Sequence, residues 1–341
     1  MAHLLLPLDI RGLGLKNRIV MPPMATRSAL PDGTVSDGML SNYNEKSRGG
    51  CLGLVIIEHG AVTPNGVASV GQLSVAGDDV IPSLRKLVET IHANGCAVVM
   101  QISHAGAFAP SEITGERAVA PSSVPELYEK LGNPSVGKLR VLDPVDIARV
   151  ILAFGEAGRR AKAAGFDGVE IHAAHGYLLS QFFSPLSNRR TDEYGGSLEG
   201  RMRLHLQIIH TVRASVGDMF PVLLRLGASD FIKGGATIED GVAAAVACVG
   251  AGADLIDVSG GLRGYSVPEL TGEGYFSGLS EKIKLAVPVP VMVTGGIATP
   301  QAADNLVATG KADLVGVGRA LLRDPQWACK ALKTLSEKLS N

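Results

Sequence analysis

Eight copies of one pattern run along the sequence: a short apolar, β-branched stretch followed by a longer stretch with helical periodicity. The short stretches predict strands at Arg18–Met24, Gly53–Glu58, Ala97–Ile102, Gly168–His172, Val222–Leu226, Leu255–Ser259, Val291–Thr294 and Leu314–Val317. The longer stretches predict helices at Asp37–Arg48, Ile81–Ala93, Pro144–Ala164, Leu198–Val216, Ile238–Gly250, Leu279–Ala286, Pro300–Thr309 and Asp324–Leu339. Such alternation is typical of a parallel sheet covered by helices.

Several predicted strands are apolar throughout (LVII, AVVMQI, VLLRL), as expected for strands buried on both faces. With 341 residues, eight units and no linker, the chain favours a closed (β/α)8 TIM barrel over a doubly wound sheet, and we expect one domain over residues 1–341. The leading segment LLLPLDIRGLGLKN predicts a hairpin that closes the bottom of the barrel. The long connections 105–142 and 173–197 are expected to build the active-site mouth.

Composition limits which cellular locations and which binding partners we expect for this chain. Lys and Arg total 32 against 33 Asp and Glu, which argues against a nucleic-acid partner or a polybasic membrane arm. No stretch reaches the ~18 apolar residues of a membrane span. The four cysteines, at positions 51, 96, 248 and 329, are far apart, so we expect inert core residues without a disulfide. A cytoplasmic protein without membrane partners is predicted.

Glycines end the last two predicted strands, in VTGGIATP and VGVGRALL. Backbone N–H groups at such turns can converge on an anion, and an arginine beside them can add charge. Barrel phosphate sites commonly lie after strands seven and eight. Gly295, Gly296, Gly318 and Arg319 therefore predict a site for a phosphate-bearing ligand, the alternative being that these glycines only make tight turns.

The segment HAAHGY follows the fourth predicted strand, at the end of the barrel where active sites form. His172 and His175 are spaced to donate two N–H bonds to one oxygen, and Tyr177, with an ordinary pKa of about 10, is a candidate acid. Two alternatives stay open at this point. The histidines could bind Zn or Fe with His104 or Glu170 recruited, as in a metal-dependent hydrolase or aldolase, or they could be satisfied within a turn.

Two more polar residues, Gln101 and Arg225, lie at the ends of apolar strands. Burying either without a partner would be costly. A ligand with carbonyl and amide groups would satisfy both, and so would a structural pair that bridges strands.

Three segments, KNRIVMPPMAT, VEIHAAHGYLLSQFFSPLSNRRTDEYGGSLEGR and GVGRALLRDP, closely resemble the old yellow enzyme family of FMN-dependent NAD(P)H oxidoreductases. The similarity covers essentially the whole chain. It implies bound FMN, NADPH or NADH as hydride donor, and a small-molecule substrate with an activated C=C bond. Because no cysteine cluster follows the barrel, we expect neither the iron–sulfur site nor the second nucleotide-binding domain of larger members.

The resemblance also implies roles for individual residues. The residues that would line the flavin are Pro23, Met24 and Ala25. Gly60 would approach the flavin through its backbone. Gln101 and Arg225 would bind the ring, and the two glycine turns with Arg319 would bind the phosphate. His172 and His175 would hold the carbonyl or nitro oxygen of the substrate, and Tyr177 would protonate the α-carbon.

Two positions depart from the family pattern. Ala25 stands where many members carry Thr or Cys, which affects the flavin potential. Arg27 stands near a substrate-facing Tyr of one subgroup, which suggests an acidic or otherwise different substrate. Relatives with similar barrels oxidise or demethylate N-methyl amines, so this chemistry is the main alternative. The sequence does not determine the oligomeric state, and it is compatible with a homo-oligomer.

Overall fold

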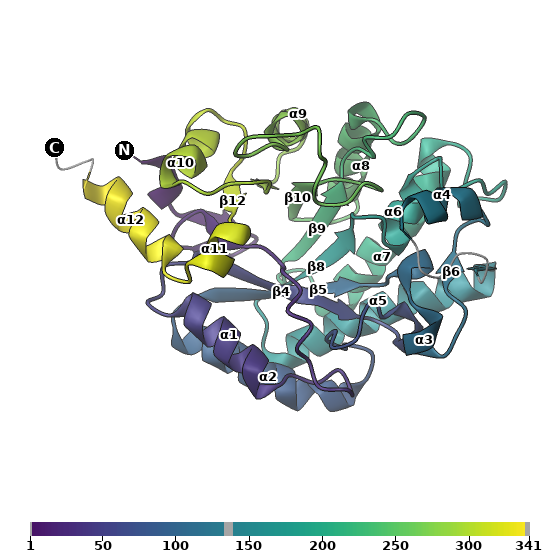
Figure 1. Cartoon of the computed structure of the whole chain (residues 1–341), viewed down its shortest axis with the longest axis horizontal. Coiled ribbons are helices and arrows are strands. Elements are labelled where there is room, and N and C mark those ends of the chain that lie inside the picture. Colours follow the sequence, from purple (N-terminus) through teal and green to yellow (C-terminus); the bar gives the residue numbers. More distant parts are fainter. Residues whose placement is uncertain (1, 133–138, 338–341) are drawn as a thin grey trace.

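The barrel strands of the computed structural model, which describes residues 2–132 and 139–337, are all parallel and close in the order β3-β4-β5-β8-β9-β10-β11-β12 (Figure 1). Their bounds are β3 Ile19–Met21, β4 Leu54–Ala61, β5 Ala97–Ser103, β8 Gly168–Ala173, β9 Val222–Gly227, β10 Leu255–Ser259, β11 Val291–Val293 and β12 Leu314–Gly316. The predicted eight-stranded α/β barrel is confirmed, with strand ends that differ from prediction by up to three residues.

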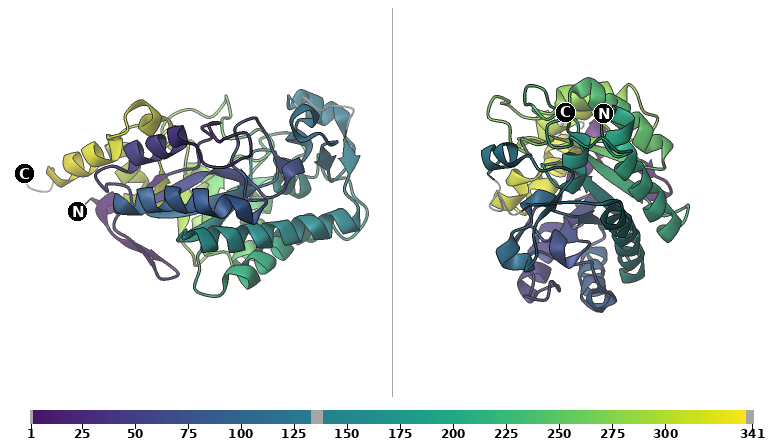
Figure 2. Two further views of the ribbon diagram at one scale, coloured as in Figure 1. Left: turned by 90° about the horizontal axis from the view of Figure 1, so that it is seen from below. Right: turned by 90° about the vertical axis from the view of Figure 1, so that its right-hand side faces the viewer.

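Helices surround this sheet (Figure 2). The longer ones are α1 Asp37–Ser47, α2 Ile81–Ala93, α5 Pro144–Ala164, α7 Leu198–Val216, α8 Ile238–Gly250, α9 Ser277–Lys284, α10 Pro300–Ala308 and α12 Trp327–Glu337. Local signals fix several ends: α5 begins at a capping box of Asp143 and Asp146 and stops at Gly165, whose φ is +96°. Among the described residues, none of the helices is both long enough and apolar enough to cross a membrane.

The predicted last helix was wrong at its start. It begins at Trp327 as α12, not at Asp324, and a short helix that was not predicted, α11 (Arg319–Arg323), precedes it. Residues 338–339 of the prediction lie outside the described residues. Pro325 explains the break, because the residue before a proline avoids helical backbone and Asp324 is extended, with φ −140° and ψ 97°.

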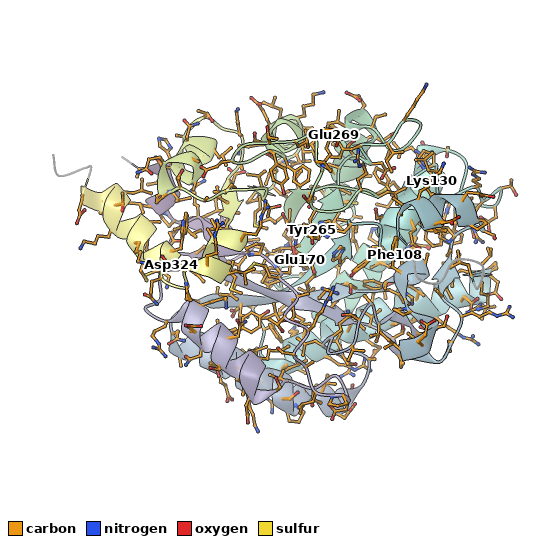
Figure 3. The ribbon with its side chains drawn as sticks, in the orientation of Figure 1. Phe108, Lys130, Glu170, Tyr265, Glu269 and Asp324 are labelled. Carbon is orange, nitrogen blue, oxygen red and sulfur yellow. A yellow bond between two sulfur atoms is a disulfide. The ribbon has the colours of Figure 1, made fainter. Side chains whose placement is uncertain are left out.

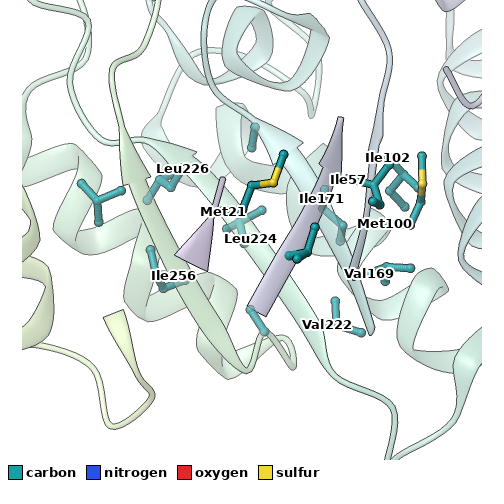
Figure 4. Packing of buried hydrophobic residues seen from close by; sticks show 14 of the residues in the cluster. Met21, Ile57, Met100, Ile102, Val169, Ile171, Val222, Leu224, Leu226 and Ile256 are labelled. Carbon is teal, nitrogen blue, oxygen red and sulfur yellow. The ribbon is translucent and has the colours of Figure 1, made fainter. Parts of the chain in front are cut away.

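The barrel is apolar on its outside and, inside, at the levels nearest the N-terminal hairpin. Outward side chains such as Ile57, Ile171 and Leu224 pack under the helices (Figure 4). Inward ones form a separate cluster with Ile10 and Leu15 of the N-terminal hairpin: Val20, Leu54, Ile56, Val99, Leu223, Leu255, Met292 and Leu314. The hairpin, β1 (Leu8–Ile10) and β2 (Leu13–Leu15), therefore closes the bottom of the barrel, as predicted.

The two long connections carry further short elements at the other end from the hairpin (Figures 1 and 2). After β5 come α3 Ser111–Thr114, β6 Val119–Ala120, α4 Pro125–Lys130 and β7 Arg140–Val141, and after β8 comes α6 Leu178–Phe183. Single 3₁₀ turns lie at His3–Leu5, Pro64–Gly66, Asp78–Val80 and Gly106–Phe108.

One expectation about the cysteines was wrong. Cys51 and Cys329, 278 residues apart, form a disulfide that ties the segment before β4 to α12. Cys96 and Cys248 are free and buried, as expected. The two bonded cysteines are adjacent only in the fold, so their wide spacing carried no signal. The expected lack of a disulfide was one argument for a cytoplasmic location, and the Cys51–Cys329 bond removes it. The cytoplasmic location stays a prediction.

Candidate active site

Four polar aromatic rings lie together where strands β4 and β8 end. The ring of His172 is 4.9 Å from that of His175 and 5.0 Å from that of Tyr177, measured between centroids. His59 of β4 completes the cluster, with its Nε2 at 3.4 Å from the Tyr177 hydroxyl. The structure thus brings the three predicted residues of HAAHGY together and adds a fourth.

Hydrogen bonds decide which imidazole nitrogens are free for a ligand. The backbone N–H of Ala174 donates to Nδ1 of His172 at 3.2 Å, so the Nε2 of that ring carries the proton. Nε2 of His175 lies 2.7 Å from the Ser259 hydroxyl. When Ser259 donates, the proton of His175 is on Nδ1. In that arrangement each ring has one N–H that can face a ligand oxygen.

Burial keeps these groups uncharged. It lowers the pKa of His59 to about 4, with smaller contributions from Arg225 and Arg27. It also lowers the pKa values of His172 and His175 well below the usual range. The histidines are therefore neutral donors at pH 7.

The expectation of an ordinary pKa for Tyr177 was wrong. Burial raises the pKa of this hydroxyl, and the positive charge of Arg27 offsets only part of the rise. The hydroxyl remains protonated at neutral pH, so it can still serve as an acid.

A bulge in β4 turns His59 toward the mouth. The register between β4 and β5 shifts between Ile57 and Gly60, and Glu58 turns outward, where its backbone N–H donates to the Tyr43 hydroxyl of α1 at 3.0 Å. His59 was not selected from the sequence. The glycine directly after it was the available signal, because glycine inside a strand often marks a bulge.

Buried polar residues lie deeper, between the apolar floor and the mouth. Nε2 of Gln101 donates to Oε1 of Glu170 at 3.1 Å, and Nε of Arg225 lies 3.1 Å from Oδ2 of Asp257. These pairs bridge neighbouring strands, which is the structural alternative foreseen for Gln101 and Arg225. The side chain of Arg225 nevertheless donates no hydrogen bond to any described residue, so its guanidinium keeps donors for a ligand. From the sequence, Glu170 (Figure 3) was considered only as a possible metal ligand, and Asp257 was not selected.

The two glycine turns lie side by side, because β11 and β12 are neighbours in the barrel. Gly295 and Gly296 have φ values of +117° and +70°, and a Cβ on either would lie 3.0–3.1 Å from the Tyr275 ring. Within the described chain, the N–H groups of Gly296, Ile297, Gly318 and Arg319 make no hydrogen bond. Free donors at two adjacent strand ends, with exposed Arg319 next to them, fit a phosphate group.

The segment after β3 borders both parts of the site. Met24 packs on the second turn, since a Cβ on Gly318 would lie 3.3 Å from its sulfur. Pro23 is half-buried, while Ala25 and Arg27 are exposed, and Arg27 has a φ of +54°. Gly60 has a packing reason to be glycine, because a Cβ there would lie 2.5 Å from Cε of Met100. Its implied approach to a flavin stays a prediction.

These features fit a flavin nucleotide. The free N–H groups and Arg319 suit its phosphate, the guanidinium of Arg225 with Gln101 suits its ring, and the histidine cluster lies at the mouth above. In the described ranges 2–132 and 139–337, no group of three His, Cys, Asp or Glu side chains could hold a metal ion. The metal-dependent alternative therefore lacks a ligand set in that part of the chain.

Comparison with known proteins agrees with this assignment. Residues 3–338 match the sequence model of the NADH:flavin oxidoreductase / NADH oxidase family. The chain is 42% identical over 329 residues to an NADH oxidase of Thermoanaerobacter brockii, covering 94% of this chain and 49% of that protein. It is 40% identical over 343 residues to an NADPH dehydrogenase of Geobacillus thermodenitrificans, covering 98% and 94% respectively.

Among solved structures, an old yellow enzyme homologue from Zymomonas mobilis superposes with a TM-score of 0.82 at 25% identity, covering 97% of this chain and 92% of that one. The chain belongs to the NADH:flavin oxidoreductase / NADH oxidase family, which includes the old yellow enzymes. It spans about half the length of the NADH oxidase and nearly all of the NADPH dehydrogenase.

Proposed function

We propose that this chain is an FMN-dependent NAD(P)H oxidoreductase that reduces the activated C=C bond of α,β-unsaturated carbonyl or nitro compounds. The observation that carries the proposal is the cluster of His172, His175 and Tyr177 above a guanidinium that has free donors. When bound, the flavin would accept hydride from NADPH or NADH and deliver it to the β-carbon of the alkene.

The chain's own groups would do the rest. The N–H groups of the two glycine turns and Arg319 would hold the phosphate, while Gln101 and Arg225 would orient the ring. The free N–H groups of His172 and His175 would bind the substrate oxygen and stabilise the negative charge that grows on it as hydride arrives. Because both rings are neutral, they polarise this oxygen by hydrogen bonding.

Tyr177 would supply the proton that completes the reduction. Hydride adds to the β-carbon, the α-carbon takes the phenolic proton, and solvent restores that proton to Tyr177. Its raised pKa keeps the Tyr177 hydroxyl protonated at neutral pH and makes it a weaker acid than free tyrosine. The nearby Nε2 of His59 is the only ring nitrogen of the described residues recorded within hydrogen-bonding distance of that hydroxyl.

The first experiment asks whether the purified protein is yellow or takes up FMN, and whether NADPH or NADH bleaches it without oxygen. A protein that stays colourless after incubation with FMN would contradict the proposal. The reduced protein is then mixed with enones, enoates, nitroalkenes and N-methyl amines in turn. Turnover only with amines as reductants would favour the oxidative demethylase alternative.

Tyr177→Phe tests the acid. The variant should keep reduction by NAD(P)H nearly unchanged, because that half-reaction needs no proton from the tyrosine. Alkene reduction should slow by roughly 10²–10⁴-fold, the usual contribution of a positioned acid. Stopped-flow measurement of the two half-reactions separates them. Equal loss in both would remove Tyr177 from the acid role.

A further inference from the structure

Two carboxyl groups share the interior of the barrel with a single guanidinium. Glu170 of β8 and Asp257 of β10 are completely buried, and Arg225 lies on the strand between them. In the register of the sheet, Arg225 pairs with Asp257 of β10 on one side of its strand and with His172 of β8 on the other. Nε of Arg225 lies 3.1 Å from Oδ2 of Asp257, too poorly aligned for a hydrogen bond.

Several atoms of this group lack partners. Oε2 of Glu170, both carboxylate oxygens of Asp257 and Nε of Arg225 form no hydrogen bond with described residues outside this group. The two carboxyl groups themselves are close enough to share a hydrogen bond when one of them is protonated. Glu170 accepts one bond, from Gln101. Directly below lies the apolar layer that includes Leu223 and Leu255. Two ionised carboxylates here would leave one buried negative charge uncompensated, which is costly.

One proton held between the carboxyl groups removes this excess charge. Burial raises the pKa of Glu170 well above its usual range, and the neighbouring charge of Asp257 raises it further. Burial raises the pKa of Asp257 to about 6, although Arg225 opposes the rise. With one proton on the two acids, the net charge of the three residues is zero.

The remaining neighbours do not alter this balance. Gln101 faces the pair from β5 and carries no charge. His172 on β8, with His59 and His175 at the mouth, is kept neutral by burial. The inward residues of the other strands at the level below are apolar: Val20 of β3, Met292 of β11 and Leu314 of β12. No second cation compensates the acids among the described neighbours.

We infer that Glu170 and Asp257 together hold one proton at neutral pH and so set the net charge that Arg225 presents to the bound flavin. They are positioning residues, because they act through Arg225 and not by contact with the ring. The redox consequence rests on the proposed function. Loss of the shared proton at alkaline pH changes the net charge of the three residues from zero to −1, which weakens the stabilisation of added electrons and lowers the midpoint potential.

Infrared spectroscopy of the flavin-free protein tests the protonation directly. At pH 7 the wild-type protein should show a C=O stretch of a protonated carboxylic acid that is lost in both Glu170→Gln and Asp257→Asn. Each single variant leaves one ionised acid beside Arg225, so the same band should vanish in both. Asp230→Asn, which changes another buried carboxyl, should retain it. A band that survives in either variant would overturn the inference.

The flavin-loaded protein gives a second measurement, the midpoint potential as a function of pH. The wild type should show an alkaline downward break in potential that Glu170→Gln lacks. The double variant, which leaves Arg225 without a negative partner, should have a higher potential than the wild type at every pH. Unchanged curves in both variants would refute the inference. If Asp257→Asn does not fold, the nearly isosteric Glu170→Gln still decides the outcome.

The two proposals fail in different ways. A protein that binds no FMN contradicts the proposed function but leaves the infrared result valid. A protein that binds FMN and reduces alkenes, yet holds both carboxyl groups ionised at pH 7, contradicts only the inference about the pair.

Discussion

His172 and His175 form a matched pair of donors because each ring has one nitrogen occupied by its surroundings. Ala174 N–H fixes the tautomer of His172, and the Ser259 hydroxyl lies against His175. The exposed ring of Tyr265, on the loop after β10 (Figure 3), meets the His175 ring at 5.7 Å, edge to face. Position along the chain gives the spacing of the two histidines, but these contacts give their direction.

Removing one of these donors should weaken binding of an oxygen ligand. His172→Ala is expected to reduce the affinity of the FMN-loaded protein for a simple phenol by roughly 5- to 13-fold, since a hydrogen bond contributes about 1–1.5 kcal/mol. Titration calorimetry measures the effect. His210→Ala, on the exposed face of α7, is the matched control and should bind the phenol normally. Tight phenol binding by His172→Ala would argue against the proposed hydrogen bond from His172 to the ligand oxygen.

At the scale of elements, helix packing buries histidines outside the site as well. His205 of α7 lies wholly buried, with its ring 6.1 Å from that of Phe183 in α6. Burial lowers the pKa of His205 to about 3. The unfolded chain binds a proton at this residue below pH 6.5 and the folded chain does not, so this histidine reduces stability as the pH falls from about 6.5 toward 3.

His205→Leu should remove that pH dependence. The free energy of unfolding of the variant, minus that of the wild type, is expected to rise by up to about 1.4 kcal/mol for each pH unit below 6.5. Urea unfolding at several pH values measures the difference. His210→Leu, on the solvent side of the same helix, is the matched exposed substitution for comparison. A constant difference for His205→Leu would mean that its pKa is not lowered in the folded state.

At the scale of the whole molecule, the barrel closes where its first strand meets its last. β3 pairs with β12, and next to this seam the N-terminal segment is held by a hydrogen bond from Leu4 N–H to Asp304 of α10. The Cys51–Cys329 disulfide joins the segment before β4 to α12. It closes a loop of nearly the entire barrel, so its loss should raise the entropy of the unfolded chain.

Cys51→Ser should therefore lower the free energy of unfolding by roughly 2–5 kcal/mol under oxidising conditions. Denaturant unfolding measures the loss, and thiol titration of the denatured wild type should find two free thiols before reduction and four after it. Reductant should lower wild-type stability to that of the variant and leave the variant unchanged. Four thiols before reduction would show that the disulfide is absent.

Much of the fold follows from local pattern. The eight alternating units, the hairpin and the boundaries of α2, α5, α7 and α8 depend on periodicity, caps and turn residues that are neighbours in sequence. The same is true of Gly295 and Gly296, whose positive φ values suit glycine. Pro325 was also a local signal, although the prediction started the last helix one residue before it, at Asp324.

The sequence by itself determined the barrel, the glycine turns and the presence of His172, His175 and Tyr177 at one strand end. Tertiary structure alone decided that His59 joins them, that Glu170 and Asp257 flank Arg225, and that Cys51 meets Cys329. The physical reason is that periodicity and turn preferences act over a few residues. Strand register, the bulge in β4 and closure of the barrel bring together side chains that are tens to hundreds of residues apart.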